Sequence, residues 1–167
     1  MEREVNLNLM PGTIEDLAAI RSLLLENGLP HSDLTPQQVI NFLVAYHGNR
    51  LVGAVGLETY DLAALLRSLV VHHDFRCLGI GARLVHEIEH QAISYGVSQL
   101  YLLTTTAEGY FTRLGYHRIE RAMTPPTIQA TSEFRSLCPA SACCLQKSLP
   151  IPGSRHRAFR TPSDQQV

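Results

Sequence analysis

The chain has 167 residues, of which 45% are hydrophobic and 17% charged, and its formal net charge is -1. This length predicts one domain with a substantial core, and the composition excludes a disordered chain and a membrane-embedded one. Sequence-independent binding to nucleic acid needs many Lys and Arg contacts to phosphate, so the near-neutral charge excludes a general nucleic-acid-binding surface.

The N-terminal segment and the cysteines indicate the compartment. The opening MEREVNLNLMPG contains acidic residues and no apolar run of signal-peptide length, and no stretch approaches the roughly 18 apolar residues of a membrane span. Cys77, Cys138, Cys143 and Cys144 show no C-x-x-C spacing, so we expect free thiols. The sequence therefore predicts a cytoplasmic protein without a membrane or nucleic-acid partner.

The predicted elements follow an α+β order. The pattern predicts, in chain order, a strand at 5–9, helices at 14–26 and from Pro36, a hairpin of strands 41–47 and 50–59, a strand at 64–71, a helix that stops at Gly96, a strand at 99–105, a short helix at 107–114, a strand at 116–120, a helix at 126–137 and a strand at 142–147. The dense apolar residues of 64–71 predict burial on both faces. We expect one domain over residues 1–149 and a flexible tail over the polar, proline-containing residues 150–167.

Residues 76–90, RCLGIGARLVHEIEH, contain two candidate catalytic motifs. HEIEH matches the zinc-protease pattern H-E-x-x-H, in which both histidines bind the metal one helical turn apart. The core-facing side of this helix is marked by its apolar residues Leu84, Val85, Ile88 and Ala92. His86 and His90 lie well away from that side and no clear third ligand follows, so we expect both to face solvent.

The other motif, Arg76-x-x-Gly79-x-Gly81, lies between a buried strand and the first turn of a helix. Unpaired backbone N–H groups and the helix dipole favour an anion there, and glycine lets the backbone approach it closely. A helix dipole contributes only about 0.3 to 1 kcal/mol per exposed charge, so several amides and Arg76 are needed to hold a pyrophosphate. Taken alone, the motif also fits a tight turn that leads into a packed helix.

The order of these elements resembles the GNAT superfamily of acyl-CoA-dependent N-acetyltransferases. The resemblance rests on the strand SLVV, the R-x-x-G-x-G loop, the long helix, the next strand and a short helix ending in R-L-G-Y, and it covers roughly residues 3–148. It implies a mixed, mostly antiparallel central sheet of about seven strands with flanking helices and one βαβ acyl-CoA-binding unit. It also implies acetyl-CoA as cosubstrate, no metal and a small-molecule amine as acceptor, and it leaves a homodimer open.

The same resemblance assigns the acetyl-CoA site. In the strand at 64–71, the backbone of the last residues would bind pantetheine, and the amides of the loop after it would bind the pyrophosphate. A backbone N–H near Val70 would stabilise the oxyanion. The residues assigned in this way are Leu69, Val70, Val71, Arg76, Cys77, Leu78, Gly79, Ile80, Gly81 and Ala82.

The catalytic residues depart from the family pattern. The acid tyrosine of the family segment Y-x-x-L-G-F corresponds to Phe111, which cannot donate a proton, so the neighbouring Tyr110 is the candidate acid. The position that often carries a carboxylate base corresponds to Arg67, and Glu58 on the preceding strand is the candidate base, with a surface charge as the alternative. Arg67 is the candidate substrate-binding residue because its planar fork suits a carboxylate or an oxyanion; the alternative is a rim salt bridge.

The segments LYLLTTTAEGYFTRLGY and SLCPASA are similar to the arsenic-resistance-associated acetyltransferase branch, called ArsN-type. This similarity implies acetyl transfer to an amino-acid-like toxin linked to arsenic resistance, and an anionic amino acid would suit Arg67. The alternative function is a non-catalytic acyl-CoA or metalloid sensor. Phe111 in place of the acid motivates the sensor, and Cys77 and Cys138 motivate metalloid binding.

Overall fold

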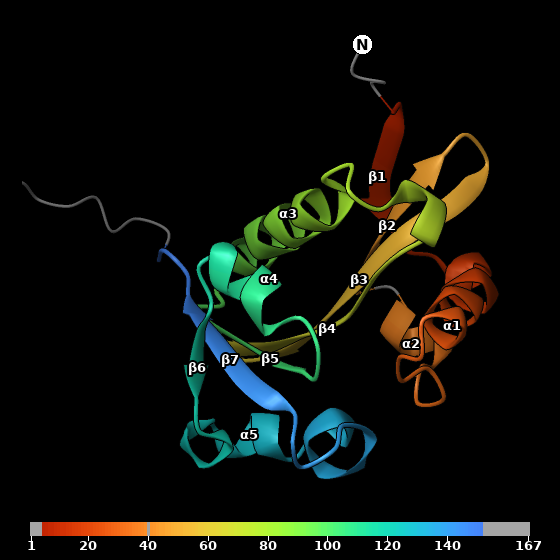
Figure 1. Cartoon of the computed structure of the whole chain (residues 1–167). Helices are drawn as coiled ribbons and strands as arrows, with labels where there is room; N and C mark the ends of the chain where they lie inside the picture. The colour runs from red at the N-terminus through yellow and green to blue at the C-terminus, as the bar shows by residue number, and fades with distance from the viewer. Residues whose placement is uncertain (1–4, 40, 152–167) are drawn as a thin grey trace, which may run out of the picture.

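The structure, a computed structural model, describes residues 5–39 and 41–151, which form a seven-stranded sheet in the order β1-β2-β3-β4-β5-β7-β6 (Figure 1). The strands are β1 (Leu7–Pro11), β2 (Phe42–His47), β3 (Arg50–Tyr60), β4 (Ala63–Val71), β5 (Gln99–Thr104), β6 (His117–Ile119) and β7 (Cys143–Ser148). The β4–β5 pair is parallel and the other neighbouring pairs are antiparallel. The predicted mixed, mostly antiparallel sheet is therefore confirmed.

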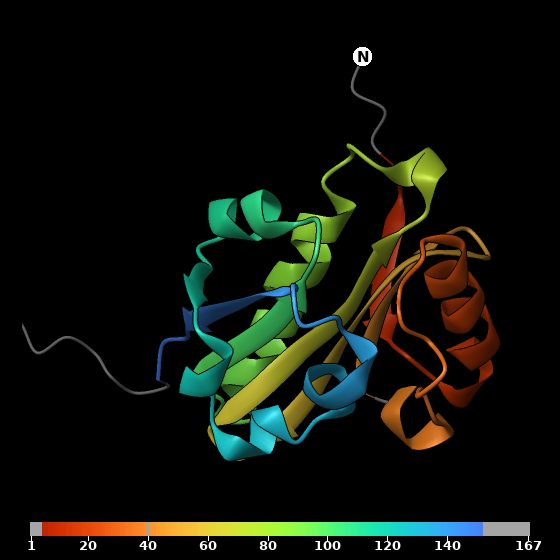
Figure 2. The ribbon, with the colours of Figure 1, turned by 60° about the horizontal axis from the view of Figure 1, so that its bottom comes forward.

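Helices cover both faces of the sheet. They are α1 (Leu17–Glu26), α2 (Pro36–Val39), α3 (Ile80–Ser94), α4 (Glu108–Arg113) and α5 (Pro126–Gln129). Figures 1 and 2 show α3 and α4 on one face, with α1, α2 and α5 on the other. No helix in the described part of the chain is long and apolar enough to cross a membrane. The β4–α3–β5 crossover is the predicted βαβ unit.

Several predicted boundaries differ from the structure. The first strand begins at Leu7 and includes Pro11, and the predicted helix at 14–26 begins as a 3-10 turn, Ile14–Asp16, before α1. The predicted helix at 126–137 divides into α5 and a π-helical turn, Glu133–Leu137. Between them the Thr131 hydroxyl donates to the carbonyl of Ile128 at 2.7 Å, a local bond that competes with the helical ladder. Of the predicted tail, residues 152–167 lie outside the described residues.

Strand β4 has a bulge in the half that follows its parallel pairing. Ala54 of β3 pairs with Val70 and Gly56 pairs with Arg67, so two residues of β4 stand opposite one residue of β3. Ser68, inside the bulge, has a φ of 57°, a left-handed conformation uncommon outside glycine. The β4–β5 register ends at the Leu65–Tyr101 pair. Beyond that pair the two strands diverge, which leaves space between them.

Candidate active site

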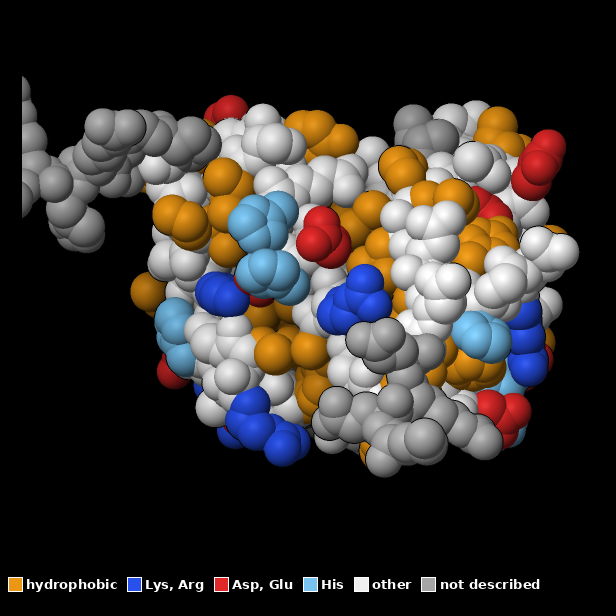
Figure 3. Space-filling model, turned by 90° about the horizontal axis from the view of Figure 1, so that it is seen from above, with side chains coloured by type: hydrophobic (Ala, Val, Ile, Leu, Met, Phe, Trp, Pro, Cys, Tyr) orange, Lys and Arg blue, Asp and Glu red, His pale blue; other side chains and the backbone are white. Residues whose placement is uncertain are grey.

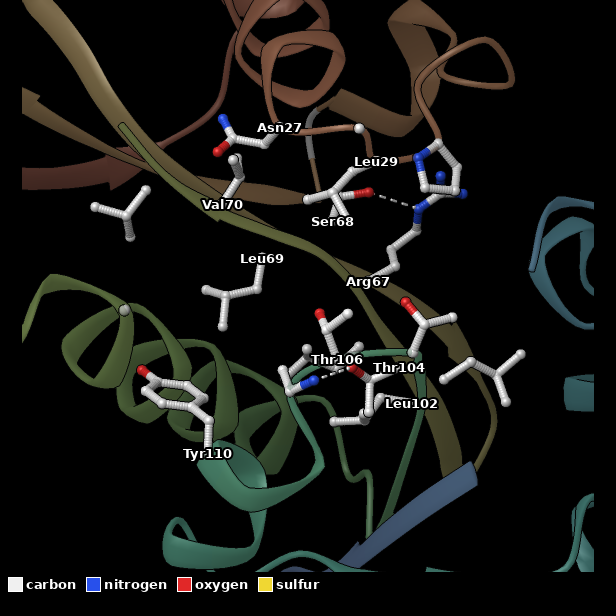
Figure 4. A pocket seen from close by; sticks show the side chains of 18 of the residues that line it. Asn27, Leu29, Arg67, Ser68, Leu69, Val70, Leu102, Thr104, Thr106 and Tyr110 are labelled. Atoms are coloured by element: carbon white, nitrogen blue, oxygen red, sulfur yellow. Dashed lines mark hydrogen bonds between the residues drawn. The ribbon is translucent and has the colours of Figure 1, made fainter. Parts of the chain in front are cut away.

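A cavity of about 1210 Å³ opens where β4 and β5 diverge. Its walls come from the turn after α1, from β4, the loop before α3, the end of β5, α4 and the π-helical turn. Figure 4 shows Tyr110 on one side, near α3, and Arg67 on the other, toward the chain that follows α1. Small-molecule sites typically measure about 300–1,000 Å³, so this cavity has room for a large cosubstrate and a second reactant.

The predicted acetyl-CoA residues come together on one side of this cavity. All of them except Leu78 line it, namely Leu69, Val70, Val71, Arg76, Cys77, Gly79, Ile80, Gly81 and Ala82. Leu78 is 47% exposed and does not line the cavity. The remaining assignments share one surface, as the loop interpretation requires.

The loop before α3 contributes free backbone amides to the cavity wall. Gly79 precedes the first helical turn with a φ of 76°, and a Cβ there would meet nothing within 4 Å. The helical ladder includes a bond from Arg83 N to Gly79 O at 3.1 Å. The amides of Ile80, Gly81 and Ala82 come before this bond, so they have no acceptor within the helix. Amides at a helix N-terminus fit an anion such as a diphosphate.

Arg76 adds a positive charge beside these amides. Its Nε donates to Val71 O at 3.2 Å, and its Nη2 donates to the Asn27 side chain. Both contacts hold the guanidinium at the end of β4, on the cavity wall. This side of the cavity therefore combines amides, a cation and glycines, which fits the diphosphate part of coenzyme A.

Neighbouring residues Tyr110 and Phe111 on α4 face different surroundings. Tyr110 is partly exposed on the cavity wall, and its hydroxyl lies 2.7 Å from the position that a Cβ on Gly81 would take. Burial raises the pKa of Tyr110, so its hydroxyl retains a proton at neutral pH. Phe111 is 5% exposed and packs against Tyr116, with ring centroids 5.5 Å apart. Glycine at position 81 thus allows a proton donor to approach the loop.

On the other side of the cavity Arg67 is the centre of a buried ionic network. Its side chain is 1% exposed, and all three guanidinium nitrogens donate to protein partners. Nε donates to Ser68 Oγ at 3.1 Å, Nη1 to Glu58 Oε1 at 2.8 Å, and both Nη atoms donate to the Asp33 carboxylate at 2.5 and 2.9 Å. The network is therefore not a rim salt bridge. An anionic substrate that approached Arg67 would find its donors already engaged.

Burial and charge act in opposite directions on Arg67. Burial lowers the pKa of the guanidinium, but the hydrogen bonds that it donates to Asp33 and Glu58 and the charges of Glu133 and Asp33 together raise it well above its usual range. Arg67 is thus a permanent cation that organises carboxylates from distant parts of the chain.

Glu58, the predicted base, lies on β3, next to Arg67 on β4. Its Oε1 accepts from Arg67, and its Oε2 accepts from the Tyr60 hydroxyl at 2.7 Å. Burial and this contact raise the pKa of Tyr60 above its usual range, so the hydroxyl remains a donor. Glu58 is not among the cavity-lining residues. Its role as base stays a prediction, and both of its carboxylate oxygens accept hydrogen bonds from protein side chains.

The structure adds two carboxylates that the sequence pattern did not indicate. Asp33 lies in the segment between α1 and α2, and Glu133 begins the π-helical turn. Both are separated from Arg67 by more than thirty positions, and neither is part of a motif. Glu133 is 5% exposed, lines the cavity and lies 3.5 Å from Arg67 Nε through Oε1. Because neither carboxylate belongs to a motif, its position beside Arg67 becomes visible only in the folded structure.

The histidines of the H-E-x-x-H motif face solvent, as predicted. His86 and His90 are exposed on α3, with their Nε2 atoms 3.1 Å apart, and Figure 3 shows histidine side chains at the surface seen from this side of the molecule. Within residues 5–39 and 41–151, the one group of three closely spaced possible metal ligands is His72, His73 and Asp74, which does not include this pair. The motif therefore lacks a third ligand in the described structure.

Comparisons with known proteins agree with this architecture. The model of the acetyltransferase (GNAT) domain family matches residues 38–118, the segment from α2 to β6 that contains the loop and the cavity's β4 wall. An uncharacterized N-acetyltransferase of Chlorobaculum tepidum is 33% identical over 93 residues, which are 55% of this chain and 59% of that protein. An amino-acid acetyltransferase of Ralstonia nicotianae is 29% identical over 50% of this chain and 19% of that protein. The chain thus spans less than two thirds of these relatives.

Solved structures share the fold. N-acetylglutamate synthase from Neisseria gonorrhoeae, complexed with coenzyme A and N-acetyl-glutamate, gives a TM-score of 0.77 at 22% identity, covering 89% of this chain and 36% of that one. A Mycobacterium tuberculosis protein in complex with CoA and NLQ gives a TM-score of 0.74 at 20% identity, covering 86% and 99%. The chain therefore has the GNAT fold, and its residues 38–118 match the acetyltransferase (GNAT) domain family.

Proposed function

We propose that this protein is an acetyl-CoA-dependent N-acetyltransferase whose acceptor is a small molecule with a free amine. The observation that carries this proposal is the row of free amides at the start of α3, which faces a cavity formed by the divergence of β4 and β5. The GNAT domain match and the N-acetyltransferases among the relatives support the same activity.

The residues of the cavity have separate roles in this proposal. Acetyl-CoA, when bound, supplies the acetyl group as a thioester. The loop amides and Arg76 hold the diphosphate, and the backbone of Leu69–Val71 holds the pantetheine arm. A backbone N–H near Val70 stabilises the oxyanion, and Tyr110 donates a proton to the leaving sulfur.

For the acceptor, we propose an amino acid or a related amine. Amino-acid acetyltransferases among the relatives favour an amino acid, and an amino-acid-like toxin linked to arsenic resistance is the narrower prediction from the sequence. Because the Arg67 donors are engaged, the carboxylate of such a substrate would need another partner. His31 also lines the cavity and is our candidate for that partner.

Release of free CoA thiol tests the proposed activity directly. The purified chain, incubated with acetyl-CoA and a panel of amines and amino acids, is expected to release thiol with at least one acceptor. Absence of release with every acceptor, in a chain that binds acetyl-CoA tightly, would favour the alternative of a non-catalytic acyl-CoA sensor. The buried Phe111 at the position of the family's acid is the observation that keeps this alternative open.

A further inference from the structure

Glu133 is the one carboxylate among the described residues that line the cavity. Its Oε1 atom lies 3.5 Å from Arg67 Nε, in an ion pair. Asp33 and Glu58, in contrast, accept hydrogen bonds from Arg67 at 2.5 to 2.9 Å and do not line the cavity. Of the three carboxylates around Arg67, Glu133 therefore has the most acceptor capacity left for a ligand.

We propose that Glu133 is the catalytic residue on the acceptor side, where it binds the ammonium group of the incoming amine and takes its proton. This inference rests on the proposed acetyltransferase function and specifies the acceptor as an amine that arrives as a cation. It replaces Glu58 with a carboxylate that reaches the cavity.

The charges around Glu133 favour a cation in the cavity. One guanidinium, that of Arg67 on β4, faces the carboxylates of Glu58 on β3, Asp33 before α2 and Glu133, so the ionised cluster carries more negative than positive charge. Coulomb attraction in a buried site of low effective dielectric is stronger than in water. An ammonium group would therefore be drawn toward Glu133, the member of the cluster that it can reach.

Burial also shifts the pKa of Glu133 into the range that suits a general base. Burial raises the pKa of its carboxyl group to about 7, with Arg67 acting to lower it and Glu58 and Asp33 acting to raise it. Nearby Cys138, on the cavity wall, has a pKa raised by burial to about 11 and stays a thiol at neutral pH. A base is most effective when its pKa lies near the working pH, because it is then both ionised and able to hold a proton.

The step assigned to Glu133 balances in atoms and charge. The ammonium group gives one proton to the Glu133 carboxylate and becomes a neutral amine. Its nitrogen forms a bond to the thioester carbonyl carbon, the carbon–sulfur bond breaks, and the electron pair leaves on sulfur. Tyr110 gives a proton to the sulfur, the second proton lost from nitrogen replaces it on Tyr110, and Glu133 returns its proton to solvent.

The two proton-handling groups lie on different sides of the cavity. Glu133 is beside Arg67, and Figure 4 shows Arg67 and Tyr110 on opposite sides, with Leu69 between them. This separation matches a reaction in which the proton acceptor and the proton donor approach the acetyl group from different directions.

The variant Glu133→Gln tests the assignment because it removes the charge and nearly preserves the shape. Wild type is assayed for thiol release with tyramine, spermidine, lysine and glutamate, and the best of these acceptors is used with each variant. We expect kcat/KM to fall about 100-fold, the usual scale for loss of a general base, with the KM for acetyl-CoA unchanged. The rise of kcat/KM with pH up to about 7 should also disappear. Glu87→Gln, on the exposed side of α3, is the matched control and should retain the wild-type rate.

A binding experiment gives a readout that does not need turnover. Calorimetry of the same amine with the CoA-saturated chain should show at least tenfold weaker binding for Glu133→Gln, and thermal melting should show that the variant is folded. A variant with wild-type turnover, pH profile and amine affinity would overturn the role of Glu133 while leaving the acetyltransferase proposal intact. Failure of wild type to release thiol with any acceptor would overturn both.

Discussion

The two sides of the cavity are built in different ways. The loop side uses consecutive residues, 76–82, whose backbone amides and glycine conformations form the proposed CoA-binding surface. The proposed acceptor side uses the carboxylates of positions 33, 58 and 133, which three separate segments bring around the buried guanidinium of Arg67. Substitutions that alter the backbone or fill its open space should therefore affect the loop side most. Substitutions that remove a buried charge should affect the other side most.

The largest effect is expected from Arg67→Met. This change would leave Asp33, Glu58 and Glu133 close together without their shared cation, and removing one partner of a buried ion pair typically costs about 3–5 kcal/mol. Urea denaturation at pH 7 should show a loss of stability on that scale. A loss below about 1 kcal/mol, the scale of a surface salt bridge, would contradict the buried network.

Gly79→Trp should weaken CoA binding at the loop without unfolding the protein. Gly79 lines the cavity and a Cβ there would meet nothing within 4 Å, so the bulky side chain should lower CoA affinity by calorimetry about 100-fold or more while the fold is kept. The positive φ should cost only about 1–2 kcal/mol. Gly96→Trp is the matched control, because Gly96 also has a positive φ and open space, at 82°, but lies at the far end of α3. Equal CoA affinity in the two variants would contradict the loop assignment.

Glu133→Gln should change the pH dependence of stability. The pKa of Glu133 is raised by burial from 4.5 to about 7, so wild type loses stability as the pH rises through this interval and the carboxyl group ionises. The melting temperature of the variant should match that of wild type below pH 4.5 and exceed it increasingly toward pH 7. At pH 7 the free energy of unfolding of the variant should be higher by up to about 3 kcal/mol. Parallel pH curves for the two proteins would show that the group is not held in a desolvated site.

Tyr110→Phe is expected to have the smallest effect. Loss of the donor should lower kcat by about tenfold, at the weak end of general acid catalysis because the thiolate is a stable leaving group. Tyr95→Phe, on the exposed C-terminal side of α3, serves as the control for loss of a tyrosine hydroxyl. An unchanged kcat in Tyr110→Phe would remove this residue as the acid and leave the proton to solvent.

The same contrast explains what the sequence could predict. The apolar periodicity and glycine spacing around residues 64–105 predicted the βαβ unit and the loop, because local patterns determine both. They could not predict the break within 126–137, where the Thr131 hydroxyl bond and the packing of Ile128 and Phe134 against β4 and β5 override a continuous helical pattern. Glu133 lies in that misread segment, so its approach to Arg67 could not be predicted either.

Glu58 stays the base that the sequence predicts, and Glu133 is the base that we propose. Glu58 was favoured by its position on the strand before Arg67, and the structure does place it 2.8 Å from the guanidinium. Whether a carboxylate near Arg67 lines the cavity, however, depends on how distant segments of the chain pack around Arg67. The alternation of side chains along a strand does not determine that packing. Glu133 lines the cavity from a different element, the π-helical turn.

A crystal structure of the chain with coenzyme A would test the shared foundation of these proposals most directly. We predict the diphosphate at the amides of residues 77–82 and the pantetheine arm along Leu69–Val71, with its thiol end directed toward the side that holds Arg67 and Glu133. Coenzyme A bound elsewhere on the chain, or a cleft between β4 and β5 that closes and excludes it, would contradict both the cosubstrate site and the acceptor site derived from it.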